Sequence, residues 1–273
     1  MIHTPRGDLH SATTTTAQTT ATTEYACKKV EDIEALLAIP YVTSPLDIAR
    51  VRAFEARVGE DGLAAVGVGD GLCFPNDYLG TEFCSLLWAS EPAIIHNMVA
   101  TVAQRIYDYI ERACQAGVRV FRIVGGEYAT QLMGQRAWDE LVVPFDKPLV
   151  DLIHRYGGIA HYHNHGNMRR FIGQIADLGI DSLDPIEQPP YGDISMPEAQ
   201  ARIGGRVCLV GGLDDMEVLE TRPLAEIRRL AEELLQSTNP LGYMLGGTSS
   251  GIYSEPAARA FIALVEISER MTG

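Results

Sequence analysis

Residues 158–167 read Gly-Ile-Ala-His-Tyr-His-Asn-His-Gly-Asn, a short apolar run that ends in polar residues. The apolar run predicts a strand that ends near the histidines. The residues that follow have the spacing of one helix face, with Met168, Phe171, Ile172 and Ile175 apolar. This stretch is therefore one β-then-α unit, and the rest of the chain repeats its pattern.

Six apolar runs share this form, each followed by polar or glycine-bearing residues and then by a helical pattern. Two helix starts are marked by Ser90-Glu91-Pro92 and Ser254-Glu255-Pro256, in which a small polar cap precedes a proline. Successive βα units predict a parallel sheet covered by helices, either a doubly wound sheet or a (β/α) barrel. The six predicted strands are Leu63–Val68, Val118–Val124, Gly158–Ala160, Ile180–Leu183, Val207–Val210 and Tyr243–Leu245.

Polar side chains that can do chemistry follow these strands directly, and in a barrel such strand ends converge on one mouth. No G-x-G-x-x-G follows the first strand, and Gly67–Gly71 opens no immediate helix, so a dinucleotide-binding fold has little support. We predict a TIM-barrel-like (β/α)8 α/β fold that is incomplete, with about six of the eight units, in one domain over residues 1–273. The side chains that follow the strands are Glu127 and Tyr128; His163 and His165; Asp184, Glu187 and Gln188; Asp214; and Thr248, Ser249 and Ser250.

Composition narrows the class of protein. The formal net charge of −14 argues against a nucleic-acid or anionic-membrane partner and favours a small-molecule substrate. Five cysteines without C-x-x-C spacing fit reduced thiols in a cytoplasm better than a disulfide framework. No run approaches the roughly 20 apolar residues of a membrane span, and no signal-peptide pattern opens the chain. We therefore expect a cytoplasmic protein.

Residues 1–30 form a threonine-rich N-terminal arm in this interpretation. Eight of the thirteen residues from Ser11 to Thr23 are threonine, a β-branched residue that favours extended pairing. This predicts a two-stranded arm with a turn near Gln18, and a frayed tail is the alternative. A sheet of six strands leaves two unpaired edges, so we expect the arm or a second subunit to cover them and predict a homodimer.

Three histidines recur with period two at residues 161, 163 and 165, so a strand end would present all three imidazoles on one face. Neutral imidazoles bind transition metals, and further ligands can come from a neighbouring strand. The alternative is a hydrogen-bonded core histidine at position 161 and polar loop residues at positions 163 and 165. The sequence thus offers half of a metal site.

The segment from Tyr156 to the C-terminus resembles the uroporphyrinogen decarboxylase superfamily, which includes zinc-dependent methyltransferases that move methyl groups between corrinoid proteins and thiols or other acceptors. In looser form the resemblance covers residues 30–273. It implies a (β/α)8 barrel with the active site at the carboxyl ends of the strands. The motifs that carry it are His163-Asn164-His165-Gly166-Asn167, Leu178–Leu183, Val210-Gly211-Gly212-Leu213-Asp214 and Gly242–Leu245.

Two departures from the family bear on function. Members are usually longer at the N-terminus, and the arginine-bearing segment that binds tetrapyrrole carboxylates in the decarboxylases has no counterpart here, which argues against decarboxylation of a polyanion. The methyltransferases bind zinc through an H-x-C pair and a distant cysteine. Here the pair is His163 and His165, and residues 247–250 contain no cysteine. A thiolate-rich metal site is therefore excluded, and an N/O site remains.

The third metal ligand that we expect is Glu187, because two histidines and a carboxylate leave a coordination position open for substrate or water. The alternative for Glu187 is a surface or helix-capping carboxylate. Glu127 is expected as a fourth ligand or general base, with an ion pair to Arg119 or Arg122 as its alternative. Asp214 is a second catalytic candidate that could equally cap a helix beginning near Asp215.

Tyr128, Gln188, Ser249 and Tyr253 are the expected substrate-binding residues. The resemblance implies a metal-dependent methyltransferase, with a divalent metal, zinc for preference, and a corrinoid carried on a partner protein. One alternative is a metal-free uroporphyrinogen-type decarboxylase of porphyrin biosynthesis that stabilises charge through Asp214. The other is a degenerate barrel that binds a ligand or partner without catalysis.

Overall fold

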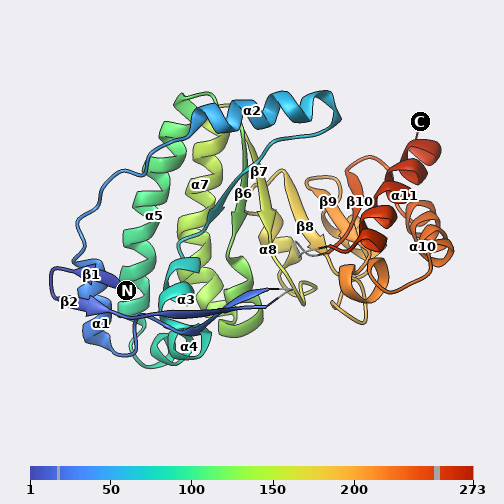
Figure 1. Ribbon diagram of the computed structural model, residues 1–273. Coiled ribbons are helices and arrows are strands. Elements are labelled where there is room, and N and C mark those ends of the chain that lie inside the picture. Colours follow the sequence, from blue (N-terminus) through green and yellow to red (C-terminus); the bar gives the residue numbers. More distant parts are fainter. Residues whose placement is uncertain (17–18, 249–252, 273) are drawn as a thin grey trace. The chain divides into compact units, whose positions relative to one another are not determined.

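The computed structural model describes residues 1–16, 19–248 and 253–272 (Figure 1). Its main sheet has six parallel strands in the order β10-β9-β8-β7-β6-β5. This order follows the chain throughout, whereas a doubly wound sheet reverses its strand order at a switch point. The predicted α/β fold with an incomplete, TIM-barrel-like sheet is therefore confirmed. The strands are β5 (Val66–Gly69), β6 (Val120–Val124), β7 (Ile159–His163), β8 (Ser182–Ile186), β9 (Cys208–Gly212) and β10 (Tyr243–Gly246).

The chain divides into two compact units, Met1–Ala160 and His161–Gly273. The single domain expected over residues 1–273 and the homodimer both stay predictions. In the first unit, β5 pairs with β6 in parallel. In the second, β8 pairs with both β7 and β9, and β9 pairs with β10. All six strands predicted from apolar runs are present, although β5 begins at Val66 rather than at Leu63.

Helices of the first unit pack on its strands through apolar faces. Helix α5 buries Ile95, Met98 and Val102 and lies beside α7 (Figure 1). The helices are α1 (Val30–Leu37), α2 (Ile48–Val58), α3 (Cys73–Leu79), α4 (Thr81–Ser90), α5 (Pro92–Gln115), α6 (Gln135–Ala137) and α7 (Val143–Arg155), with a 3-10 turn η1 (Gly59–Asp61) and two π-helical segments, η2 (Tyr128–Met133) and η3 (Trp138–Val142).

Of the two helix starts expected from Ser-Glu-Pro sequences, one has the predicted serine cap and the other does not. Ser254 caps the last helix, since its Oγ accepts the N–H of Ala257 at 3.4 Å. Ser90 instead ends α4 and donates its hydroxyl to the carbonyl of Leu86 at 3.0 Å, while Pro92 opens α5 without a side-chain cap. The expectation of a Ser90 cap is wrong because a preceding helix runs directly up to α5.

The second unit has helices on the strands β7 to β10. Helices α10 and α11 pack against each other (Figure 1), and α10 buries Ile227, Leu234 and Leu235. Helix α8 is shorter than the stripe from Met168 suggests, since residues 169–171 form turns. The helices are α8 (Ile172–Ala176), α9 (Met196–Ile203), α10 (Leu224–Gln236) and α11 (Glu255–Thr272), with a π-helical segment η4 (Asp215–Leu219).

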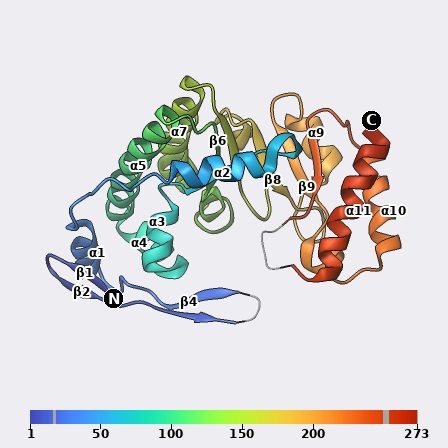
Figure 2. The same cartoon turned by 45° about the horizontal axis from the view of Figure 1, so that its top comes forward.

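The threonine-rich segment is a two-stranded antiparallel arm, as predicted (Figure 2). Its strands are β3 (Ala12–Thr15) and β4 (Thr20–Glu24), and the expected turn at Gln18 lies outside the described residues. Before it comes a hairpin that the sequence did not predict, of β1 (Ile2–Thr4) and β2 (Gly7–Leu9). Leu9 is buried beside α1, which ties this hairpin to the first unit.

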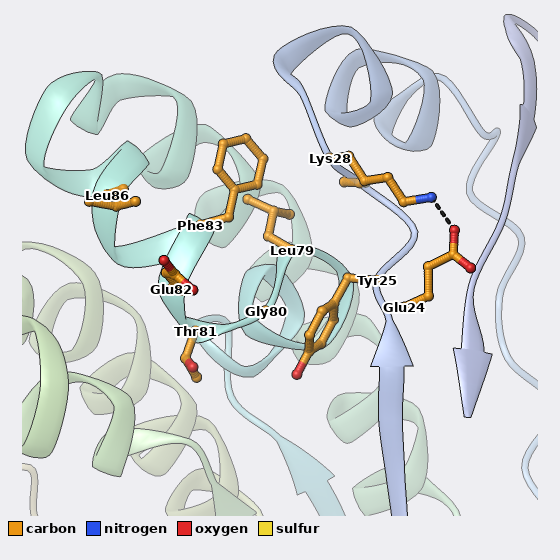
Figure 3. Close-up of a pocket in the computed structure, with 10 residues that line it drawn as sticks. Glu24, Tyr25, Lys28, Leu79, Gly80, Thr81, Glu82, Phe83 and Leu86 are labelled. Carbon is orange, nitrogen blue, oxygen red and sulfur yellow. Dashed lines mark hydrogen bonds and ion pairs between the residues drawn. The ribbon is translucent and has the colours of Figure 1, made fainter. Parts of the chain in front are cut away.

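A hollow of about 590 Å³ lies where the arm joins the first unit (Figure 3). Tyr25 lies against Gly80, where a Cβ would meet the tyrosine ring at 2.6 Å, so only glycine allows this contact. Lys28 and Glu24 form an ion pair at the rim. The lining holds no histidine, so we take this hollow as a packing feature of the arm.

All five cysteines are free thiols in the structure. Among the helices that the structure describes, none is long and apolar enough to cross a membrane.

Candidate functional site

Strands β7 and β8 place the first two histidines opposite polar partners. In their parallel register, His161 lies beside Ser182, and His163 beside Asp184. The Nδ1 atom of His161 is 2.7 Å from the hydroxyl of Ser182. The Nδ1 atom of His163 is 3.0 Å from Oδ1 of Asp184. The period-two spacing thus brings both imidazoles onto one face of the sheet, as the strand geometry requires.

The carboxylate of Asp184 connects these two histidines. Its Oδ1 atom is also 3.0 Å from Nε2 of His161, so one oxygen contacts both rings. Burial raises the pKa of Asp184, but the hydrogen bonds and charges of His161 and His163 outweigh it and hold that pKa well below its usual range. The carboxyl group is therefore ionised, and an anion at this position fixes the orientation of both imidazoles.

His165 has a carboxylate partner of its own. Its Nδ1 atom is 3.1 Å from Oε1 of Glu187, and the other oxygen of Glu187 accepts the backbone N–H of Gly166. Burial raises the pKa of Glu187, but these hydrogen bonds and the charges of His165 and His163 outweigh it and lower the pKa. The rings of His163 and His165 are perpendicular, with centroids 4.5 Å apart. The site is thus two adjacent imidazoles, each held by an anionic carboxylate.

The contacts of these histidines and carboxylates indicate how well the site would suit a metal ion. Among the residues that the structure describes, no group of three or more His, Cys, Asp or Glu side chains could hold an ion together. The two imidazoles nevertheless have the environment of metal-binding histidines, which usually donate one ring N–H to a carboxylate that orients them. His163 and His165 therefore fit as a ligand pair, and Glu187 fits as the carboxylate that orients His165. Glu187 as third ligand stays a prediction.

Two further predicted site residues have local hydrogen-bond partners in the second unit. Gln188 donates to the carbonyl of Gly212 at 3.0 Å and accepts the N–H of Met196 at 3.1 Å. Asp214 accepts the N–H groups of Met216 and Glu217 at 3.0 and 2.7 Å, so it is the N-cap of η4. The capping role considered for Asp214 is thus observed, and its catalytic role stays a prediction.

The loop after β10 is tied to a buried carboxylate that sequence reasoning missed. Asp215 accepts the N–H of Thr248 and the hydroxyl of Tyr253, each at 2.7 Å. The predicted substrate-binding residue Ser249 lies outside the described residues, as does Ser250. The hydroxyl of Tyr253 is therefore bonded to a protein carboxylate, and its role toward substrate stays a prediction.

The first unit contains a second group of acids, at the carboxyl ends of β5 and β6. Asp70 directly follows β5 and is buried, and its Oδ1 accepts the N–H of Cys73 at 2.7 Å. Burial raises the pKa of Asp70 well above its usual range, and the nearby carboxylates of Asp146 and Glu127 raise it further. Asp146 comes from α7 and is buried as well. Three carboxyl groups thus share a site with little water.

Glu127 lies at the carboxyl end of β6, where the sequence predicts it. One of its oxygens, Oε2, is buried and has no hydrogen-bond partner in the described part of the chain. The ion pair considered with Arg119 is not formed, because that guanidinium donates to the carbonyls of Cys114 and Val118. Tyr128 is the first residue of η2. The pKa of its phenol is raised, mainly by burial. Glu127 as general base stays a prediction.

The position of Asp70 in the sequence could have identified it as a site residue. Like Glu127, it follows a predicted strand, but residues 67–71 are expected to open no immediate helix, so Asp70 is not among the predicted site residues. The expectation that residues 67–71 open no immediate helix is wrong, since α3 begins at Cys73. The position after a strand and before a helix was sufficient to nominate Asp70, whereas Asp146 lies within a helix and gave no such signal.

Asp70→Asn is expected to stabilise the protein, and increasingly so as pH rises. The folded state raises the pKa of Asp70, so its ionisation destabilises the fold as pH rises above the usual aspartate range, whereas asparagine cannot ionise. Urea unfolding midpoints between about pH 4 and pH 9 measure the difference between variant and wild type. The exposed Asp151→Asn is the control. A wild type that is the more stable form at alkaline pH would contradict this account.

Comparisons with known proteins complete the description. The uroporphyrinogen decarboxylase (URO-D) family matches residues 80–270. A methyltransferase from Methanosarcina mazei shares the fold, with a TM-score of 0.74 over 97% of this chain and 76% of that chain at 16% identity. Two further structures are too distant to carry an argument. A 3-keto-D-glucoside 4-epimerase from E. coli matches with a TM-score of 0.44 at 16% identity, over 84% of this chain and 97% of that chain. A D-psicose 3-epimerase from Clostridium cellulolyticum H10 matches with a TM-score of 0.38 at 11% identity, over 84% of this chain and 92% of that chain. No curated protein gives a significant match.

Proposed function

We propose that this chain, which belongs to the uroporphyrinogen decarboxylase family, is a methyltransferase that works with a corrinoid protein. The observation that carries the proposal is the pair of adjacent imidazoles, His163 and His165, each bonded to an anionic carboxylate. Both lie within the matched residues 80–270. The methyltransferase named among the fold neighbours supports the same class. Free thiols at all five cysteines favour a cytoplasmic location.

The histidine pair gives this site its chemistry. His163 and His165 would hold a divalent metal, zinc for preference, and a bound metal would lower the pKa of a thiol acceptor so that it is present as the thiolate. Asp184 and Glu187 keep the two rings in place and balance positive charge with their own anionic groups. The carboxylates thus act through the imidazoles, as positioning residues.

The transfer itself conserves atoms and electrons. The thiol first releases its proton, and a lone pair of the thiolate sulfur then forms the new S–C bond with the methyl carbon. The Co–C bond of the methylcorrinoid breaks at the same time, and its electron pair stays on cobalt, which is reduced from Co(III) to Co(I). The products are a methyl thioether and a Co(I) corrinoid.

The test supplies methylcob(III)alamin as donor and 2-mercaptoethanol as acceptor, in the absence of oxygen. We expect conversion to cob(I)alamin, followed by absorbance, and one equivalent of methyl thioether, measured by mass spectrometry. Heat-denatured protein gives the background rate. A rate at background together with release of CO₂ from uroporphyrinogen would replace methyl transfer with the decarboxylase alternative, and inactivity toward both substrates would favour a non-catalytic barrel.

A further inference from the structure

Two connected hollows in the first unit lie along β5, an edge strand of the main sheet. One has a volume of about 940 Å³ and is lined by α2 and by Val66 and Gly67 of β5. The other has a volume of about 670 Å³ and is lined by Gly67, Val68 and Gly69. Gly67 and Tyr109 line both, so the two hollows form one groove, the β5 groove. None of its lining residues belongs to the candidate sites described above.

The strand beside this groove has an unpaired edge. Among the described strands, β5 has β6 as its one neighbour in the sheet order. Among the described residues, no backbone or side-chain hydrogen bond reaches the other edge of Val66–Gly69. The glycines at positions 67 and 69 have no side chain to cover the backbone, and a Cβ at Gly67 would meet no atom within 4 Å. An open edge of this kind can accept a further strand.

The groove is also rich in arginines without acidic partners. Arg50, Arg57 and Arg105 line it, and none of them forms an ion pair with a described residue. Neighbouring arginines do, since Arg52 pairs with Glu55 and Arg112 with Asp108. In a chain with 36 acidic and 22 basic residues, unpaired arginines gathered in one place leave local positive charge that an anionic partner can use.

Aromatic side chains complete the surface. The guanidinium of Arg57 lies over the ring of Phe54 at 5.0 Å, and that of Arg105 over the ring of Tyr41 at 5.3 Å. Tyr41 and Phe54 are each 43% exposed. Helix α2 buries no residue at all, although its sequence is amphipathic. Arginine and aromatic residues are the types enriched in protein interfaces, and here they flank an open strand edge.

We propose that the β5 groove binds an extended acidic segment of a partner protein. The segment adds a parallel or antiparallel strand to the free edge of Val66–Gly69 through backbone hydrogen bonds. Its carboxylates pair with Arg50, Arg57 and Arg105, and its apolar side chains cover Tyr41 and Phe54. One acid lines the groove, Asp47, and its carboxylate accepts the N–H of Arg50 as the cap of α2.

The test uses a fluorescein-labelled peptide of alternating valine and glutamate, ten residues long, and measures its binding to the full chain by fluorescence anisotropy. We expect saturable binding that weakens as salt rises. The triple variant Arg50→Gln, Arg57→Gln, Arg105→Gln should weaken binding by about tenfold or more. Arg155→Gln, an exposed arginine of α7 outside the groove, should not. Circular dichroism confirms that the variants are folded.

Two modified peptides separate strand addition from charge alone. A peptide N-methylated at every residue has no backbone N–H to donate from either edge and should not bind, and a valine-lysine peptide should fail as well. Slower amide hydrogen exchange at residues 66–69 on binding places the strand. Equal binding of the N-methylated peptide, or full competition by inorganic phosphate, would overturn the proposal. So would a dimer that the triple variant converts to monomer while the peptide does not bind, since a second copy would then fill the groove.

Discussion

His163→Ala and His165→Ala are each expected to lower kcat/KM for methyl transfer by about 10²-fold or more. Each replacement removes one of the two adjacent imidazoles and leaves its carboxylate partner without the ring that it orients. Glu187→Gln keeps the shape but removes the charge, so its loss is expected to be milder, about tenfold to 10²-fold. The methylcob(III)alamin assay measures all three variants against wild type.

The two histidine variants differ in their expected stability. The side chain of His163 is 6% exposed and its loss leaves the half-buried carboxylate of Asp184 with fewer partners, so His163→Ala is expected to cost about 1–3 kcal/mol in unfolding free energy. The side chain of His165 is 35% exposed, so its variant should unfold close to wild type and gives the cleaner test. The exposed His10→Ala is the control for both.

Metal content gives a readout that does not depend on activity. After dialysis and zinc addition, wild-type protein is expected to retain zinc, and both histidine variants are expected to retain less, as measured by mass spectrometry of the native protein. Less than about a tenth of an equivalent in wild type would remove the metal from the proposal. Full activity in destabilised alanine variants would instead make these histidines structural.

The fold was predictable because its signal is local and repeated. Each strand is an apolar run that ends in polar residues before a helix begins, and this order alone requires parallel strands with crossover helices. Period two correctly placed His161 and His163 on one face, since neighbouring side chains of a strand point to opposite sides. For Asp214 the pattern left a helix cap and a catalytic role open, and the structure shows the cap, in which the carboxylate accepts the N–H groups two and three residues ahead.

The group of acids in the first unit could not be assembled from sequence in the same way. Asp146 lies within α7 and comes close to Asp70 only after that helix packs, so no sequence spacing predicts that the two acids are neighbours. Gln188 illustrates the opposite case. Its position after β8 suggested substrate binding, but its amide bonds to the backbone of Gly212 and Met196. Sequence places a polar residue at a strand end, whereas packing decides which partner it meets.

Gly125→Ala is expected to destabilise the protein by about 3–5 kcal/mol, because two costs coincide at this position. The backbone of Gly125 has a φ of +146°, which L-residues with a side chain rarely adopt. A Cβ there would also lie 1.9 Å from Oδ1 of Asp70, a carboxyl group held in place by the N–H of Cys73. Neither the strand end nor the buried acid can move without breaking hydrogen bonds.

Urea unfolding at constant m-value measures this loss, and two comparisons divide it into strain and clash. Gly7 has a φ of +124° with no atom within 4 Å of an added Cβ, so Gly7→Ala reports backbone strain alone, about 1–2 kcal/mol. Removing the clashing group should recover the remainder, so Gly125→Ala is expected to cost less in an Asp70→Ala background than in wild type. Equal costs in both backgrounds would mean that Asp70 is not the group that requires glycine at position 125, and that the strand end alone sets the constraint.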